Sequence, residues 1–467
     1  MKGLIPKWID LFVVTLVMSV TAQTSWATDP SALHAAQKER LVIIGMDGLT
    51  WNLLDPMMER GELPNFKALV DQGQGTLLES ERPIRSPALW TTIATGQPRS
   101  THGIYDFVTG TNYWPKELRS KKQRLMTSDM RASPALWNLA SHHHKESLVV
   151  GWLNTWPAEP VEGTIVAPYV ALGQNKQVSI KGKIYRDERG QTWPEERFGE
   201  IKNLIVSTRD ITRQQVKQIA NVPGKRAKLY KQIPMLKRSV EAIRWSLAST
   251  YTNLNVLEHE LKTRPNADLV MTYFDGSDTL AHRFWHLRQP VKTIAKRLRA
   301  HGLPAKAAKN LKARFGKVVE GYYKVLDEGL GRIIAAAGPN ATIMIVSDHG
   351  IGTQKTRRSL HKHVPFDAKH TLDGVMMVSG PNIQQSATRG RATIYDVAPT
   401  ALYLMGLPVP NLPGQIRTEL VQPAFVMRHP PTMVAPTLTD TPMEAPDLAN
   451  YFEEGEVERL KSLGYVN

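Results

Sequence analysis

Short apolar runs alternate with helical patterns along this chain, which predicts a mostly parallel sheet covered by helices on both faces. Three of the runs, at 41–46, 268–274 and 341–346, have the length and composition of buried strands. A helix is predicted over 64–72, where Pro64 suits the first turn and apolar residues recur with helical spacing. The pattern therefore predicts an α/β fold.

Side chains that can bind metal ions follow the carboxyl ends of these predicted strands. Asp47 follows the first run, and Asp348 and His349 follow the third. Asp278 and His282 come soon after the second, and their i, i+4 spacing places them on one face of a helical turn, about 5 to 6 Å apart at Cβ. A single Asp after a strand is more often a cap or turn residue. Three strand ends with the same chemistry indicate one shared site at the carboxyl edge of the sheet.

Ser86 lies directly before Pro87 at the predicted start of another helix. Because proline suits the first helical position, the Ser86 hydroxyl is expected beside free backbone N–H groups at the positive helix end. One interpretation is an N-cap serine. The other is a nucleophile, since a hydroxyl next to divalent ions can lose its proton.

Ten stretches of the sequence, in this order, resemble the alkaline phosphatase superfamily, in particular its type I phosphodiesterase/nucleotide pyrophosphatase branch. They are VIIGMDG (42–48), GELPNFKALVDQG (61–73), RSPALWTTIATG (85–96), HGIYDF (102–107), GWLNTWPAEP (151–160), FDGSDTLAH (274–282), VSDHG (346–350), HTLDGVMMVSGP (370–381), IYDVAPTALYLMGLPVP (394–410) and EVERLKSLGY (456–465). The resemblance implies a mostly parallel sheet sandwiched between helices and a metal-dependent phosphoric ester hydrolase.

The resemblance also implies two divalent ions. Their ligands would be Asp47, Asp348, His349 and the Ser86 oxygen for one ion, and Asp278, His282 and one further histidine for the other. His370 is the expected further histidine, and His361 and His363 compete with it. Since the chain has no cysteine, carboxylate and imidazole are the available ligands, which suits Zn²⁺ and tolerates Mn²⁺.

In this interpretation Ser86 attacks phosphorus and forms a phosphoseryl intermediate. Nucleotide pyrophosphatases of the branch usually carry an Asn a few residues after the HGI motif, where it binds a phosphoryl oxygen. The run from His102 to Phe107 has no Asn. The choice between monoester and diester therefore stays open.

Other functions compete with hydrolysis of a phosphoester. A sulfatase needs Cys or Ser followed by x-Pro-x-Arg, which the run from Ser86 to Trp90 does not provide. A phosphoglycerol or headgroup transferase would suit a basic surface. A non-catalytic anion-binding envelope protein is the alternative outside enzymes, and the intact set of Asp, His and Ser positions argues against it.

The formal net charge of +16 is large, and residues 292–317 hold nine Lys or Arg and no acid. This stretch predicts either a solvated helix pair broken at Gly302, or a surface that attracts anionic substrates or membrane headgroups. No motif for nucleic acid recognition is present. The expected partners are a small or lipid-linked phosphoester and, peripherally, an anionic membrane; no oligomeric state is predicted.

The N-terminal segment is predicted to be a signal peptide over 1–27. Lys2 and Lys7 precede the apolar stretch from Leu11 to Val20, and Ser25-Trp26-Ala27 resembles a cleavage site. We therefore expect an exported protein, periplasmic or secreted, with an uncleaved membrane anchor as the alternative.

The rest of the chain divides by composition. The catalytic core is predicted over 40–160 and 265–410, and a helical insert without strands over 161–264, capping the site. Residues 411–467 are predicted to form a proline-rich strap and a C-terminal helix.

Two smaller groups of residues have structural roles as their expected ones. The cluster His142–His144 lacks carboxylates nearby and is predicted to be a solvent-exposed turn. Trp90, Trp152 and Trp156 are candidates for a pocket wall, although core packing is the expected role for each.

Overall fold

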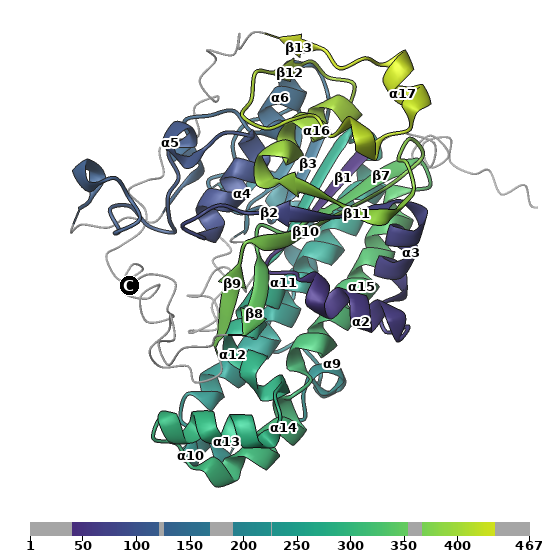
Figure 1. Cartoon of the computed structure of the whole chain (residues 1–467). Coiled ribbons are helices and arrows are strands. Elements are labelled where there is room, and N and C mark those ends of the chain that lie inside the picture. Colours follow the sequence, from purple (N-terminus) through teal and green to yellow (C-terminus); the bar gives the residue numbers. More distant parts are fainter. Residues whose placement is uncertain (1–39, 121–125, 169–189, 226, 354–366, 435–467) are drawn as a thin grey trace, which may run out of the picture.

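The computed structural model describes residues 40–120, 126–168, 190–225, 227–353 and 367–434. Its centre is a nine-stranded sheet (Figure 1). In spatial order the strands are β11 (Ser386–Thr393), β2 (Gln74–Glu79), β10 (Asp373–Ser379), β7 (Ala341–Val346), β1 (Arg40–Met46), β6 (Leu269–Phe274), β3 (Ser147–Val150), β4 (Gly163–Val166) and β5 (Thr192–Trp193). The five strands from β7 to β4 run parallel, and β10 and β5 run against their neighbours.

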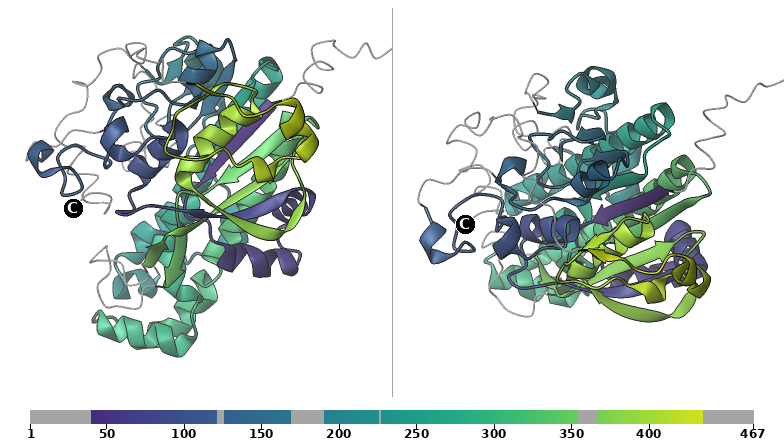
Figure 2. Two further views of the ribbon diagram at one scale, coloured as in Figure 1. Left: turned by 45° about the horizontal axis from the view of Figure 1, so that its top comes forward. Right: turned by 90° about the horizontal axis from the view of Figure 1, so that it is seen from above.

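Helices cover both faces of this sheet (Figure 2). One face carries α2 (Trp51–Glu59), α3 (Pro64–Gln72), α11 (Leu236–Thr263), α12 (Gly276–Phe284) and α15 (Val318–Ala337); the other carries α4 (Ser86–Thr95), α6 (Leu136–His142) and α16 (Val397–Leu404). Strand β1 shows why two cores form. Val42 and Ile44 belong to the first core and Leu41 and Ile43 to the second, because successive side chains point to opposite faces. The predicted fold class is confirmed.

The three strands predicted from apolar runs are β1, β6 and β7, and the predicted helix over 64–72 is α3. The expectation that strands stop at Pro160 is corrected. Both β4 and β5 lie within 161–264 and extend the sheet, and α11 packs against β3, β6, α12 and α15. Strands β4 and β5, with four and two residues, are too short to appear in the sequence as apolar runs.

The C-terminal part is described as far as Val434. It contains the short helix α17 (Pro423–Arg428) and the strand β13 (Met433–Val434), which pairs with β12 (Val409–Pro410). The predicted signal peptide and the predicted C-terminal helix lie outside the described residues. No helix within the described ranges is both long and apolar enough to cross a bilayer.

Candidate functional site

Two strand ends bring Asp47, Asp348 and His349 together, and we call these three residues the strand-end group. Strands β1 and β7 are neighbours in parallel register, so the residues that follow them emerge at the same edge of the sheet. The His349 Nε2 atom lies 3.2 Å from Asp47 Oδ1 and 3.6 Å from Asp348 Oδ2. All three side chains are buried, and their ligand atoms lie close enough to hold one metal ion.

The strand-end group concentrates charge where water is excluded. Burial and the neighbouring Asp47 raise the pKa of Asp348 well above its usual value. Burial lowers the pKa of His349, but Asp348 and Asp47 outweigh it and raise that pKa to about 10. Four ligand atoms have no hydrogen-bond partner among the described residues, namely Asp47 Oδ1, both Asp348 oxygens and His349 Nε2. Buried polar atoms without partners are costly, and a divalent cation would satisfy all four.

The carboxylate of Asp47 is held in one orientation by hydrogen bonds. Tyr273, near the end of β6, donates its hydroxyl to Asp47 Oδ2 at 2.7 Å, and the Trp90 Nε1 of α4 donates to the same oxygen at 3.3 Å. Ser277 donates to the Asp47 carbonyl at 2.5 Å. The Oδ1 oxygen is therefore left facing His349. Sequence reasoning missed Tyr273, which looks like any apolar residue of a buried strand.

Helix α12 and strand β9 (Ala368–Thr371) supply a second cluster, Asp278, His282 and His370, which we call the helix group. Asp278 Oδ1 lies 3.1 Å from His282 Nε2 and 3.2 Å from His370 Nε2, and the two Nε2 atoms are 2.6 Å apart. Strand β9 pairs with β8 (Gly350–Thr353), which directly follows His349. The structure therefore brings His370 into the site, whereas His361 and His363 lie outside the described residues.

Charges within the helix group shift all three pKa values. Burial raises the pKa of Asp278, but His282 and His370 outweigh it, so that the pKa falls well below its usual value. Burial lowers the pKa of His282, but Asp278 and Asp367 outweigh it and raise that pKa to about 10. Burial, together with the neighbouring His349, lowers the pKa of His370 to about 4. The helix group is thus a carboxylate with one charged and one neutral imidazole, all of which can bind a cation once the proton leaves.

Asp367 fixes the orientation of His282 from outside the cluster. Its Oδ1 lies 2.5 Å from His282 Nδ1, and the carboxylate is fully buried. The Nε2 nitrogen is therefore the one that faces Asp278 and His370. A carboxylate behind a histidine in this way is the usual support of a metal ligand. The only sequence signal for Asp367 is its place three residues before His370.

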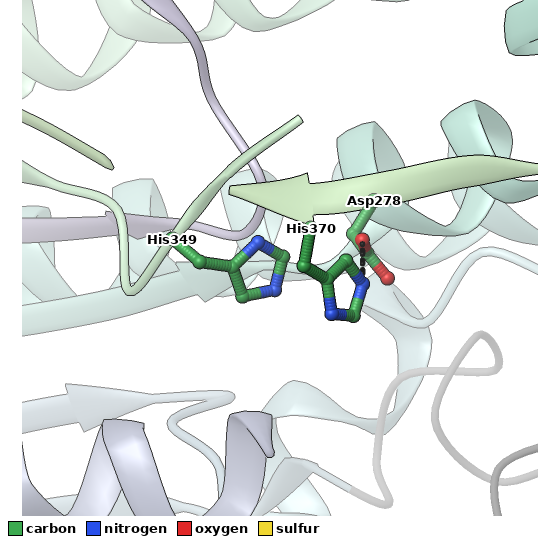
Figure 3. A group of neighbouring side chains, drawn as sticks. All are labelled: Asp278, His349 and His370. Carbon is green, nitrogen blue, oxygen red and sulfur yellow. Dashed lines mark ion pairs between the residues drawn. The ribbon is translucent and has the colours of Figure 1, made fainter. Parts of the chain in front are cut away.

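The strand-end group and the helix group lie next to each other. The rings of His349 and His370 stack with centroids 4.0 Å apart (Figure 3). Gly48 lies against Asp278, because a Cβ atom added to it would lie 3.1 Å from Asp278 Cβ. Its φ of 69° is also one that side chains rarely adopt. Glycine at this position lets the chain after Asp47 approach the helix group closely.

Ser86 begins helix α4, and Arg85 occupies the N-cap position, so the helix starts one residue earlier than predicted. Ser86 is buried, with 9 % of its surface exposed. Trp90, whose indole reaches Asp47, lies one turn further along the same face of α4. Side chains of a helix lean toward its N-terminus. Ser86 therefore lies on the same face of α4 as Trp90, whose indole contacts the strand-end group.

Arg85, directly before Ser86, is held by Asp106. The Arg85 Nε donates to Asp106 Oδ1 at 2.8 Å, the guanidinium makes a second, shorter bond to the same oxygen, and its carbon lies 4.3 Å from the ring centre of Tyr113. Thr111 donates to the other Asp106 oxygen at 2.8 Å. The run from His102 to Phe107 lacks the expected Asn but supplies the buried carboxylate of Asp106. That carboxylate anchors Arg85, the residue before Ser86.

The three tryptophans and the histidine cluster from the sequence analysis have structural roles. Trp90, Trp152 and Trp156 are buried in the core, as expected, and Trp90 has the additional hydrogen bond to Asp47. His144 lies in a turn after α6, highly exposed and paired with Glu162 at 2.9 Å. His142 ends α6 and is exposed, and the turn after it contains His143, which is half-buried, and His144. The predicted exposed turn is therefore found at His144, whereas the expected lack of carboxylates nearby is corrected by Glu162.

Comparison with known proteins shows which protein family this chain matches. A family model described as type I phosphodiesterase / nucleotide pyrophosphatase matches residues 41–402. Comparison with curated proteins finds no match. Among solved structures, murine ectonucleotide pyrophosphatase / phosphodiesterase 5 aligns with 10 % identity and a TM-score of 0.44, over 82 % of this chain and 100 % of that chain. Wild-type alkaline phosphatase PafA aligns with 12 % identity and a TM-score of 0.47, over 82 % of this chain and 98 % of that chain.

Proposed function

The chain belongs to the type I phosphodiesterase / nucleotide pyrophosphatase family and is therefore a phosphoester hydrolase, and from this premise we propose that it works through a phosphoseryl intermediate on Ser86 beside two divalent ions. The observation that carries the proposal is the convergence of two buried ligand groups. The strand-end group contains four ligand atoms without a hydrogen-bond partner among the described residues, and the helix group contains one, Asp278 Oδ1. Helix α4, which begins at Ser86, contacts the strand-end group through Trp90.

The residues present fit two cations. The strand-end group would hold one ion, with the Ser86 oxygen as a further ligand, and the helix group would hold the other. Carboxylate and imidazole donors favour Zn²⁺, with Mn²⁺ as the alternative. When bound, the two ions would stabilise negative charge on the attacking and leaving oxygens.

The chain itself would position the nucleophile. The Ser86 oxygen forms a bond to phosphorus while the bond between phosphorus and the leaving oxygen breaks. The proton of the hydroxyl passes to solvent, and the leaving oxygen takes one from solvent. Water then cleaves the phosphoseryl bond and restores Ser86. Arg85 and Asp106 hold the backbone before Ser86, and the positive end of α4 favours the anionic form of its oxygen.

We further propose that the substrate is a small or lipid-linked phosphoester and that the protein acts after export, in the periplasm or outside the cell. The signal-like pattern of residues 1–27 supports export, and the net charge of +16 supports an anionic substrate.

Ser86→Ala tests the nucleophile. Activity would be measured on p-nitrophenyl phosphate, bis-p-nitrophenyl phosphate and p-nitrophenyl sulfate, with chelated and metal-reloaded protein. We expect kcat on the preferred phosphoester to fall by roughly three or more orders of magnitude, while metal content stays at two ions per chain. Mass spectrometry of wild-type protein quenched during turnover should find phosphate on the peptide that contains Ser86.

Ser147→Ala is the matched control, because Ser147 is also buried but starts β3 at the opposite edge of the sheet. It should keep wild-type activity. If Ser86→Ala remains active, direct attack by water replaces the phosphoseryl route. A preference for the sulfate ester would instead assign a sulfatase.

A further inference from the structure

Two stretches of chain that contain no carboxylate meet at one end of the molecule. Residues 211–240 and 279–319 hold neither Asp nor Glu. They meet where the Asn221 N–H donates to the Arg314 carbonyl at 3.0 Å and the Arg314 Nη1 donates to the Asn221 carbonyl at 3.0 Å. Figure 1 shows α10 (Lys228–Gln232) at the same end as α13 (Val291–Ala300) and α14 (Ala308–Phe315). The sequence pattern pointed only to the second of these stretches.

We call this end the basic pole and define it by its exposed cations. They are Lys225, Lys228, Lys231, Lys292, Lys296, Arg299, Lys306 and Lys309. Within the described part of the chain, none of these side chains forms an ion pair. Some exposed cations elsewhere on the surface do form ion pairs, for example Lys67 with Asp71 at 2.5 Å and Arg389 with Asp55 at 2.7 Å. Unpaired charges of one sign repel each other and attract an anionic partner.

Helix α13 shows how the pole presents its charges. Lys292, Lys296 and Arg299 are exposed at i, i+4 and i+7 and so share one face, while Ile294 and Leu298 are buried on the opposite side. The apolar side of α13 packs in the protein core, so the helix offers an anionic surface only the charges of its outer face.

The aromatic residues of this region argue against single-stranded nucleic acid as the partner. Proteins that bind such strands stack bases on exposed aromatic rings. Here Phe284, Trp285 and Phe315 are buried in the core. Tyr230 of α10 is partly buried, and its hydroxyl donates to the Pro223 carbonyl at 3.2 Å.

We propose that the basic pole docks on the surface of an anionic phospholipid bilayer, with its lysines and Arg299 at the level of the headgroups. The docking surface does not depend on the phosphoseryl route, since it uses none of the residues of the strand-end or helix groups.

Vesicle binding of the full chain tests this surface. The probes are vesicles of phosphatidylcholine with phosphatidylglycerol, vesicles of phosphatidylcholine only, and a single-stranded DNA. The pole variant carries Gln at Lys228, Lys231, Lys296, Arg299, Lys306 and Lys309. The control variant carries Gln at six paired surface cations, Arg60, Lys67, Lys324, Arg389, Arg391 and Arg417. Both variants lose six positive charges and keep the N-terminal segment, so net charge and that segment contribute equally to both.

Each basic side chain near an anionic surface contributes a factor of about five to binding. If three of the six touch the bilayer at once, the pole variant should bind anionic vesicles about a hundredfold more weakly, and added salt should weaken wild-type binding similarly. The control variant and Ser86→Ala should bind as the wild type does.

Four results would overturn the proposal. Equal losses in the pole and control variants would mean that net charge alone drives binding, and unchanged binding in the pole variant would mean a solvated surface. Tighter wild-type binding to DNA than to anionic vesicles would replace the bilayer with nucleic acid. Weaker binding of Ser86→Ala to anionic vesicles would place the lipid contact in the catalytic centre, whether or not that variant is inactive.

Discussion

Replacing Asp367 by Asn should weaken one of two metal-binding steps and leave the other unchanged. Asp367 contacts the helix group through the 2.5 Å contact between its Oδ1 and His282 Nδ1, and its charge also acts on Arg297. Asn keeps the size of the side chain and can still accept a hydrogen bond, but it removes the negative charge. The substitution therefore tests the charge behind His282 rather than packing.

The size of the effect follows from the strength of that contact. A hydrogen bond to a charged group contributes about 1.5–3 kcal/mol, which corresponds to roughly 10- to 150-fold in affinity. Residues that support metal ligands contribute about 10- to 100-fold when replaced. A second effect opposes this loss, since Asp367 helps to raise the pKa of His282 to about 10 and the ion must displace that proton. The loss of affinity should therefore grow from pH 7 toward pH 9, where proton competition weakens.

Competition with a chelator measures both steps, with Zn²⁺ titrated into metal-free protein at several pH values. The matched control is Asp327→Asn, because Asp327 is also buried and accepts hydrogen bonds, from the backbone of Asn65 and Phe66, away from both groups. It should leave both steps unchanged. If Asp367→Asn left both Zn²⁺-binding steps unaltered, or weakened both equally, the assignment of Asp367 to the helix group would be refuted.

Two further predictions concern the metal-free protein and the other ligand group. Tyr273→Phe removes a 2.7 Å hydrogen bond to the strand-end carboxylate, so it should weaken the step that Asp367→Asn spares, again by about 10- to 100-fold, as the same titration will show. His282 and His349 have pKa values of about 10 in the folded chain, above the unfolded value, so their contribution to stability is complete below about pH 6.5 and is lost as pH rises through 10. Thermal unfolding of chelated protein should show Tm falling between pH 7 and pH 10, and a constant Tm would contradict these shifts.

Much of the strand-end group could be predicted because buried parallel strands appear in sequence as continuous apolar runs. Strand β7 matches the predicted run exactly in its limits, and Asp348 and His349 follow it. Helix geometry then places Asp278 and His282 together. These predictions needed only local patterns and the rule that strands of a parallel sheet end at a common edge.

The supporting residues could not be predicted because their contacts are distant in sequence. Tyr273 meets Asp47 across 226 positions, and Asp367 meets His282 across 85. Neither a tyrosine nor an aspartate at these positions indicates, from sequence, that it supports a metal ligand. His370 was expected from the family resemblance and not from the apolar pattern, because the strand that carries it is short and half polar; its pairing with β8 brings that histidine to the site.

The β8–β9 ribbon has a consequence for substrate selection. His349 precedes one strand of this ribbon and His370 lies on the other, so the spacing between the two ligand groups is set by backbone hydrogen bonds. Such a frame cannot widen by a change of side-chain rotamer. In the proposed function this fixed spacing would accommodate the phosphorus centre that phosphoester substrates share. Selection of the leaving alcohol would then depend on residues outside the ribbon.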